Sequence, residues 1–307
     1  MLTTSSLFRK PETSPHNIMK HHHLFTALAG LCLSAALQAQ TPRYRLVWQD
    51  DFKGRRLDNS SWAKIPRGLS AWNRHMSDHE SLYAVRRGKL ILRGRVNDGI
   101  APTDTARYIT GGVFTKGLRT VCHGKVEVRA KLEGAQGAWP AIWMLPADAQ
   151  WPYGGEIDIM ERLNHDAKVY QTIHTQYTYI LGHEDEPPHG STAPIDPTGY
   201  NIYAVEILPD SLVFSVNGQH TFTYPRIQTQ EPGQFPFGTP FYLLIDMQIE
   251  GTWVGSCKTR GISRRDESGL GPHVRAHHLT TGERTPRQPQ RQHDTHALFW
   301  KPAAALS

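Results

Sequence analysis

Apolar and polar residues alternate along short stretches in the middle of this chain. In the stretch 126–132 every second residue is apolar, and the residues between them are charged. This period of two is typical of a β-strand that buries one face and exposes the other. The run 212–216 is followed by Asn217-Gly218 and by a second run that ends at Tyr224. Because Asn-Gly suits a type I′ turn, this segment predicts a β-hairpin.

Most of the region 44–255 has the same character. Glycine and proline separate the short apolar runs, and neither a long amphipathic helix nor a fixed-period repeat is visible. Many short strands within about 200 residues favour an antiparallel β-sandwich or barrel. The further strands that we expect are 89–96, 109–115, 138–144, 156–161, 169–174, 201–208 and 241–250.

The positive charge of the chain is concentrated at its two ends. The formal net charge is +6 over 307 residues. Residues 40–255 hold 22 basic and 23 acidic side chains, whereas 1–39 carry a net +2 and 256–307 a net +5. A nucleic-acid-binding domain needs a basic patch in its folded part, so nucleic acid is not an expected partner. No apolar run reaches the roughly 18 residues of a membrane span.

The N-terminal segment 1–39 has the layout of a secretory signal peptide. Met19 is a candidate for the true start, and Lys20 with the three histidines after it forms a polar n-region. The stretch 24–37 is apolar, and Leu37-Gln38-Ala39 is a candidate cleavage site. We therefore expect a secreted or periplasmic protein.

The C-terminal segment 256–307 differs from the rest of the chain. It is rich in Arg, His, Pro and Gln and shows no sustained alternation. We interpret it either as a disordered basic extension or as the product of a frameshift just after Gly255. The expected limits are 1–39 for the signal peptide, 40–255 for the folded domain and 256–307 for the tail. A disulfide framework is excluded because one cysteine falls in each segment: Cys32, Cys122 and Cys257.

Three acidic residues cluster in Gly155-Glu156-Ile157-Asp158-Ile159-Met160-Glu161. Strict alternation sends Glu161 into the core, where an unpaired carboxylate costs roughly several kcal/mol. One extra residue at Ile159-Met160, a β-bulge, returns Glu161 to the face of Glu156 and Asp158. The two glutamate Cα atoms then lie about 13 Å apart. Their carboxyls can approach the about 5–5.5 Å separation of retaining glycosidases, while Asp158 can share a proton with Glu156.

Tryptophans accompany this acidic strand. Trp139 and Trp143 stand four residues apart, so they share one face of their strand. Flat aromatic rings suit the apolar faces of sugar rings, and core packing explains either tryptophan equally well. Two other interpretations of the acidic stretch remain open. One is a polar strand face without catalytic work, and the other is a Ca²⁺ or Mg²⁺ site, which a single strand rarely surrounds.

The acidic stretch resembles the signature of family 16 glycoside hydrolases in its bulged, laminarinase-like form. The resemblance covers roughly 44–255 and implies an all-β, concanavalin A-like antiparallel β-jelly roll with a concave carbohydrate-binding cleft. It implies that Glu156 is the nucleophile, Asp158 the assisting acid and Glu161 the acid/base. The other matching stretches are Trp48-Gln49-Asp50-Asp51-Phe52, Thr110-Gly111-Gly112-Val113-Phe114-Thr115-Lys116-Gly117, Gly124-Lys125-Val126-Glu127-Val128-Arg129-Ala130-Lys131, Pro240-Phe241-Tyr242-Leu243-Leu244 and Gly251-Thr252-Trp253-Val254-Gly255.

The resemblance also implies substrate-binding residues. Trp139, Trp143 and Trp253 would line sugar subsites, and His174 would lie near the acid/base. Laminarinase-like members show a Trp-Gly-Asn-x-Glu stretch near the place where this chain has Trp72, Asn73 and Arg74. These three residues would either contact sugar or form an ordered loop.

Two other features depart from the family pattern. Gly112 stands where an arginine is usual, which weakens the expectation of a β-1,3-glucan substrate. Such enzymes also close with a strand that contains an Asp-aromatic-Val-Arg-like stretch and often helps a structural calcium site. We expect no such strand in 256–307, so the usual C-terminal contributor to a calcium site is missing.

Together these observations predict a retaining endo-β-glycanase that needs no cofactor and binds a polysaccharide. The expected substrate is a β-1,3- or mixed-linkage glucan. An endo-β-galactosidase acting on keratan- or mucin-type glycans is the alternative within the same class. A non-catalytic carbohydrate-binding jelly roll is the alternative from another class. We expect a monomer.

Overall fold

The computed structural model describes residues 43–258 and 273–280. The chain divides into two units, Met1–Thr41 and Pro42–Ser307, and every described residue belongs to the second. The predicted signal peptide and most of the C-terminal segment therefore lie outside the described residues. No helix in the described part is long and apolar enough to cross a membrane.

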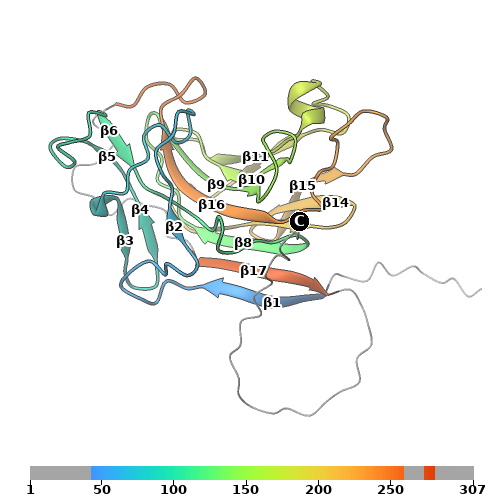
Figure 1. Cartoon of the computed structure of the whole chain (residues 1–307), viewed down its shortest axis with the longest axis horizontal. Helices are drawn as coiled ribbons and strands as arrows, with labels where there is room; N and C mark the ends of the chain where they lie inside the picture. Colours follow the sequence, from blue (N-terminus) through green and yellow to red (C-terminus); the bar gives the residue numbers. More distant parts are fainter. Residues whose placement is uncertain (1–42, 259–272, 281–307) are drawn as a thin grey trace, which may run out of the picture. The chain divides into compact units, whose positions relative to one another are not determined.

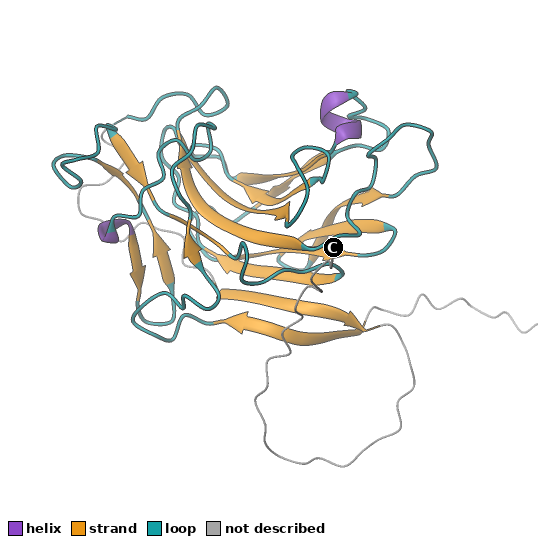
Figure 2. Ribbon diagram, viewed as in Figure 1, coloured by secondary structure: helices purple, strands orange, loops and turns teal. Residues whose placement is uncertain are grey.

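Two antiparallel sheets form the body of the second unit (Figures 1 and 2). The first sheet has the strand order β1 (Arg43–Asp50), β17 (His273–Thr280), β8 (Gly124–Ala130), β13 (Asn201–Ile207), β14 (Ser211–Val216) and β15 (Gln219–Pro225). The second has the order β12 (Gly190–Pro194), β11 (Lys168–His174), β10 (Glu156–Glu161), β9 (Ala138–Pro146), β16 (Phe241–Ile249), β7 (Gly112–Phe114) and β2 (Ala63–Lys64).

Smaller elements complete the described part. One two-stranded sheet joins β3 (Tyr83–Val85) to β4 (Leu90–Leu92), and another joins β5 (Gly94–Val96) to β6 (Tyr108–Thr110). The helical segments here are a 3₁₀ turn, η1 (Glu80–Leu82), and a π-helical turn, η2 (Gln176–Ile180). Figure 2 shows these two turns in purple among many orange strands. The prediction of an all-β antiparallel sandwich is confirmed.

The main core lies between the facing sides of the two sheets. The alternating strand β8 contributes Val126 and Val128, and the opposite sheet contributes Ile142 and Ile157, all with at most 1% of their surface exposed. Burial of such side chains is the dominant favourable term in folding. The other side of the second sheet, which curves upward in Figure 1, has its own smaller cluster of buried residues. One face of this sheet therefore packs in the main core, and the other carries the smaller cluster. The acidic strand lies in this sheet.

The predicted strands are found, with two refinements. The stretches 89–96 and 109–115 are each interrupted, giving β4 and β5 in the first and β6 and β7 in the second. The hairpin of β14 and β15 turns at Asn217 and Gly218, whose φ angles of 52° and 76° lie in the left-handed region. This geometry is what a type I′ turn requires.

The expectation that 256–307 contributes no terminal strand is wrong. His273–Thr280 forms β17, which pairs on one side with β1 and on the other with β8. Val274 and Arg275 supply the Val-Arg pair of the expected stretch, but Pro272 and His273 stand where the acid and the aromatic residue were sought. The strand was missed because its polar histidines hide the alternation.

Candidate active site

A β-bulge in β10 brings the three acidic residues onto one face of the sheet. Against β11, Asp158 is paired with Thr172 and Glu161 with Tyr170, so three steps along β10 match two along its neighbour. Against β9 the register shifts between Asp158 and Met160. The predicted extra residue is therefore present, and both bulge residues, Ile159 and Met160, are fully buried. The bulge solves the problem of Glu161, which would otherwise point into the apolar core.

Asp158 lies between the two glutamates and is itself buried, with 2% of its surface exposed. It shares a side-chain hydrogen bond with Glu156. The imidazole Nε2 of His174 lies 3.5 Å from Asp158 Oδ2. His174 is paired across the strands with Glu156, so it lies at the Glu156 end of the site and not beside Glu161. Burial, with the neighbouring His189, lowers the pKa of His174 to about 4, and the ring is neutral at pH 7.

Glu161 has a different hydrogen-bond partner. The indole Nε1 of Trp139 donates to Glu161 Oε1 at 2.8 Å. Trp139 also meets Trp253 edge to face, with ring centroids 5.6 Å apart, and Tyr170 meets Trp253 at 5.4 Å. Trp253 is 47% exposed. The predicted grouping of Trp139 and Trp253 beside the acidic strand is thus present in the structure, with Tyr170 as a third member that the sequence did not reveal.

Burial raises the pKa values of all three carboxyls. The pKa of Glu156 rises to about 7, although hydrogen bonds from Trp151 and Asp158 oppose the rise. The pKa of Glu161 rises to about 8, because burial is reinforced by the negative charge of Glu156. Burial and the charges of both glutamates raise the pKa of Asp158 well above its ordinary value. The raised pKa lets Glu161 keep its proton near neutral pH, as a general acid requires.

Trp143 does not offer an exposed ring to a ligand. Only 4% of its surface is exposed, and Trp72 meets it edge to face with centroids 4.8 Å apart. Its Nε1 donates at 3.0 Å to Asp246 Oδ2. Trp143 lies on the same face as Trp139, as expected, but Trp72 covers it. Trp143 therefore belongs to the smaller buried cluster on this side of the sheet, which forms the floor of the site. Asp246 is a fully buried carboxyl next to Trp143, and its role was not evident from the sequence because it reads only as a polar interruption of the apolar strand β16.

The other two residues of the expected Trp72 loop are held by local contacts. Asn73 accepts a hydrogen bond at Oδ1 from the Ser70 N–H, 3.1 Å away. The Nε of Arg74 donates to His75 Nε2 at 3.2 Å. His75 in turn lies 3.4 Å from Glu250, close to the loop that carries Trp253. Asn73 therefore has a clear role in ordering the loop, whereas Trp72 reaches the floor of the site.

Trp151 is a further residue that sequence reasoning missed. It lies in the loop between β9 and β10, and its side chain hydrogen-bonds Glu156. The neighbouring Gly155 has a φ of 85°, and a Cβ there would lie 2.7 Å from the Phe237 ring. Because glycine tolerates a positive φ and has no Cβ, the chain can pass close to Phe237 and begin β10 at Glu156. The run Trp151-Pro152-Tyr153-Gly154-Gly155 directly before the acids was the available signal.

The described residues do not present a clear calcium site. The group of acidic and histidine side chains whose ligand atoms lie within 4.8 Å of one another is Glu156, Asp158 and His174. A neutral imidazole and proton-sharing carboxyls do not match the many oxygen ligands that Ca²⁺ prefers. In β1, both oxygens of Asp50 already accept hydrogen bonds, from Phe52 N at 2.7 Å and Trp62 Nε1 at 2.9 Å. The expectation that the protein requires no cofactor stays a prediction.

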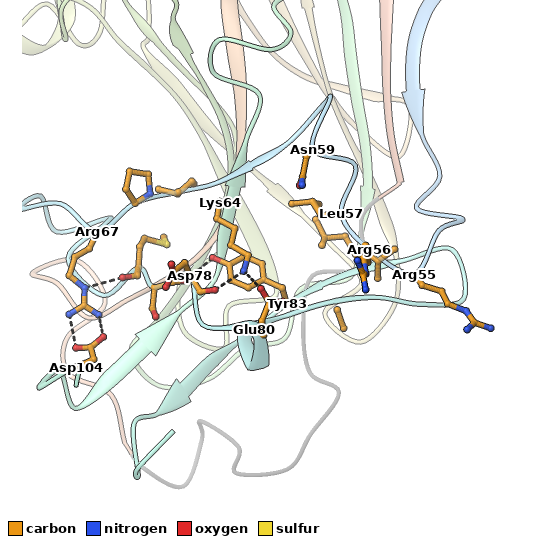
Figure 3. Close-up of a pocket in the computed structure, with 17 residues that line it drawn as sticks. Arg55, Arg56, Leu57, Asn59, Lys64, Arg67, Asp78, Glu80, Tyr83 and Asp104 are labelled. Carbon is orange, nitrogen blue, oxygen red and sulfur yellow. Dashed lines mark hydrogen bonds and ion pairs between the residues drawn. The ribbon is translucent and has the colours of Figure 1, made fainter. Parts of the chain in front are cut away.

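A separate pocket of about 1060 Å³ lies beside β2, η1 and β3, and its lining includes none of the β10 carboxylates. Figure 3 shows Lys64 and Arg67 paired with acidic residues that line the same pocket. The Nζ of Lys64 donates to Asp78 O and to Glu80, and Arg67 pairs with Asp104 through both terminal nitrogens. Although this pocket is large, it is not the candidate reactive site, because the candidate nucleophile and acid lie together on β10.

Comparisons with known proteins support the interpretation of the chain as a glycoside hydrolase. The model of the family described as glycosyl hydrolases family 16 matches residues 91–263. A keratan-sulfate endo-1,4-beta-galactosidase from Sphingobacterium multivorum is 33% identical over 265 residues, which cover 83% of this chain and 60% of that protein. A beta-glucanase from Rhodothermus marinus is 29% identical over 234 residues, covering 70% of this chain and 79% of that one. The X-ray structure of the laminarinase from Rhodothermus marinus superposes with a TM-score of 0.69 at 25% identity, covering 79% of this chain and all of that one.

The fold and the carboxyl-bearing strand thus define a glycoside hydrolase. The chain belongs to glycosyl hydrolase family 16. It spans about three fifths of the length of its keratan-sulfate-cleaving relative and about four fifths of the beta-glucanase.

Proposed function

We propose that this chain is a retaining endo-β-glycanase that cleaves internal β-glycosidic bonds of a polysaccharide. The observation that carries the proposal is the bulge of β10, which presents Glu156, Asp158 and Glu161 together on one face. Burial raises the pKa values of both glutamates, and a raised pKa on Glu161 suits the acid of a double-displacement reaction.

In this reaction Glu156 attacks the anomeric carbon while Glu161 donates its proton to the glycosidic oxygen. The leaving sugar departs and Glu156 is left as a neutral ester. The ester no longer carries the negative charge that helps to raise the pKa of Glu161. The pKa of Glu161 then falls, so Glu161 can accept a proton from water in the second step. Asp158 holds Glu156 through their shared hydrogen bond, and Trp139 orients Glu161.

The proposed substrate is a β-1,3- or mixed-linkage glucan. The likeness to a beta-glucanase and to a laminarinase supports it. Cleavage of a keratan-type galactan is the second candidate, because the relative named for that activity has the higher identity of the two curated proteins described above. The departures at Gly112 and in the Trp72 loop also favour keeping this candidate.

Release of reducing ends from laminarin, mixed-linkage glucan, agarose, keratan and mucin separates these substrates. We expect hydrolysis of laminarin or of mixed-linkage glucan, whereas cleavage of keratan or mucin instead would favour the second candidate. The first product should retain its anomeric configuration, and Glu156→Gln should lose turnover but keep binding. Undiminished turnover by Glu156→Gln would refute the assignment of the nucleophile. Binding without hydrolysis of any of these polysaccharides by the unmodified chain would identify a carbohydrate-binding jelly roll instead.

The remaining proposals concern the whole protein. We propose that 1–39 is removed as a signal peptide during export and that the protein acts as a monomer outside the cytoplasm. N-terminal sequencing of exported protein tests the first, with Gln40 as the expected first residue. Light scattering of the purified protein tests the second.

A further inference from the structure

Several large apolar side chains are exposed to solvent at the Glu156 end of the site. Tyr153 and Tyr179 are each 54% exposed, Ile180 is 52% exposed and Trp151 is 45% exposed. They come from the β9–β10 loop and from η2. Trp151 and Tyr179 meet at 4.6 Å between ring centroids, with their planes 61° apart. An exposed apolar cluster of this kind needs an explanation, because folding alone would bury it.

The turn η2 that carries Tyr179 is firmly held. The Thr175 and Thr178 side chains form a reciprocal capping box across its start. Between them, Tyr177 is buried, donates from its hydroxyl to Glu186 O at 3.0 Å, and stacks on His183 at 4.4 Å. Tyr179 is therefore exposed on a fixed support and not on a loosely attached loop. Figure 1 shows η2 rising above the end of β11 on the side of the curved sheet opposite β5 and β6.

The exposed cluster is continuous with the proposed catalytic residues. Trp151 hydrogen-bonds Glu156, and the Tyr179 ring meets the edge of His174 at 5.9 Å. His174 in turn contacts Asp158. A glycan bound at the carboxyls that extends past Glu156 therefore meets Trp151 and Tyr179 next. At the other end of β10, the Trp139 and Trp253 rings lie beside Glu161.

The two segments that carry this cluster are one-sided in charge. Within the described segments 147–155 and 175–190 there is no lysine or arginine. The acidic residues there are all exposed: Asp148, Glu184, Asp185 and Glu186. These two segments therefore present negative charge and no lysine or arginine to a bound sugar, so like-charge repulsion disfavours an anionic ring.

We propose that Tyr179, together with Trp151, forms a stacking subsite for an uncharged pyranose ring of the glycan chain bound at β10. This inference rests on the proposed function and refines it, since it selects neutral stretches of glycan over sulfated ones. Aromatic rings present a large, rigid and partly polar surface at low cost in conformational entropy, which suits the flat face of a sugar. Tyr179 is a specificity-determining residue in this proposal and has no part in bond cleavage.

Binding is measured by calorimetry in the Glu156→Gln background, so that the ligand survives. The probes are disaccharides and hexasaccharides of the β-1,3-glucose series and of the N-acetyllactosamine series, the latter with and without sulfate. We expect Tyr179→Ala to weaken binding of the better unsulfated hexasaccharide on the order of tenfold, and Tyr179→Phe to restore it. Binding of the disaccharide should stay unchanged, and the sulfated hexasaccharide should bind more weakly than its unsulfated counterpart.

Leu118→Ala is the matched control, because Leu118 is also an exposed apolar residue, at 42%, but lies between β7 and β8. Equal affinity of Tyr179→Ala and Tyr179→Phe for the hexasaccharide would overturn the proposal. So would an equal loss for disaccharide and hexasaccharide, which would mean that Tyr179 acts through His174. Preference for the sulfated probe, or no binding of any probe, would overturn it as well. Hydrolysis by the unmodified chain is scored separately, so binding through Tyr179 without turnover counts only against the proposed function.

Discussion

The indole N–H of Trp143 donates a 3.0 Å hydrogen bond to Asp246, a carboxyl with no exposed surface on β16, which lies two strands from the acidic strand β10 in the same sheet. Burial raises the pKa of Asp246 to about 7, while the hydrogen bonds of Trp143 and Gln248 limit the rise. The charge of Asp246 also contributes to the raised pKa values of Asp158 and Glu161. The pair Trp143–Asp246 therefore links the packing around Trp143 to the protonation of the carboxyls on β10.

Replacement of Asp246 by Asn should change how stability depends on pH. The folded pKa lies above the unfolded value, so the folded state keeps a proton that the unfolded state releases between about pH 4 and about pH 7. This contribution to stability is complete below about pH 4 and is lost as pH rises to about 7. Asp246→Asn, which keeps an acceptor for Trp143, should therefore gain stability relative to the unmodified chain as pH rises, by up to about 4 kcal/mol. Urea unfolding at both ends of this pH range measures the difference; a constant difference would mean that Asp246 does not titrate there.

Gly112 leaves the space that Asp246 occupies. A Cβ at Gly112 would lie 2.7 Å from Asp246 Cβ, 2.9 Å from Ile65 Cδ1 and 3.0 Å from Met76 Sδ. All three neighbours are buried, so none can move aside freely. Gly112→Ala should cost about 1–3 kcal/mol of unfolding free energy. Gly238→Ala is the control, since a Cβ there meets nothing within 4 Å. Equal melting temperatures of the two variants would contradict this account of the floor.

Loss of the hydrogen bond from Trp139 should move the pH profile of the reaction. This bond favours the ionised form of Glu161 and so lowers its pKa. In Trp139→Phe the pKa of Glu161 rises further. The basic limb of the kcat/KM profile should shift upward by about one pH unit. Trp253→Phe keeps the edge-to-face neighbour of Trp139 as an aromatic ring and leaves the bond to Glu161 in place. The basic limb should not move in this control. A shift of equal size in both variants, or a downward shift in Trp139→Phe, would argue against Trp139 as the partner that orients the acid.

The strand β17 should be essential for a stable fold. A chain shortened to end at Lys258 loses β17 and leaves β1 and β8 without their shared neighbour. Unpaired strand edges lose hydrogen bonds and promote aggregation. We expect low soluble yield and a clearly lower melting temperature, whereas a chain that ends at Thr280 should resemble the full chain. Equal melting temperatures of the two shortened chains would show that β17 adds nothing to stability.

The sequence predicted the fold class and the local geometry of β10 well, because both follow from strict rules. The alternation in β8 fixes a buried face, and the position of Glu161 among isoleucines demands a bulge. Residues whose environment depends on distant segments were harder to predict. Asp246 reads as a polar interruption of an apolar strand, and only the pairing of β16 with β9 and β7 shows that it faces Trp143 and Gly112.

The solvent exposure of individual side chains was the hardest property to predict from the sequence. Trp139 and Trp143 have identical spacing signals, yet one hydrogen-bonds Glu161 and the other is covered by Trp72, which is about 70 residues away in the chain. Tyr179 gave no signal at all, because a single π-helical turn is too short to show a period. The strand β17 was hidden for another reason: its polar histidines mask the alternation that is typical of a strand.

The order β1–β17–β8 has a consequence for how the chain folds after synthesis. The first described strand pairs with the last, across more than two hundred intervening residues. A ribosome therefore releases β1 long before its partner exists, and the first sheet cannot close until nearly the entire described chain has emerged. Long-range strand pairing of this kind slows folding, since loop closure precedes the gain from the contact. A chain built in this way remains incompletely folded through most of its translation, and the last strand acts as the closing step that commits it to the native state.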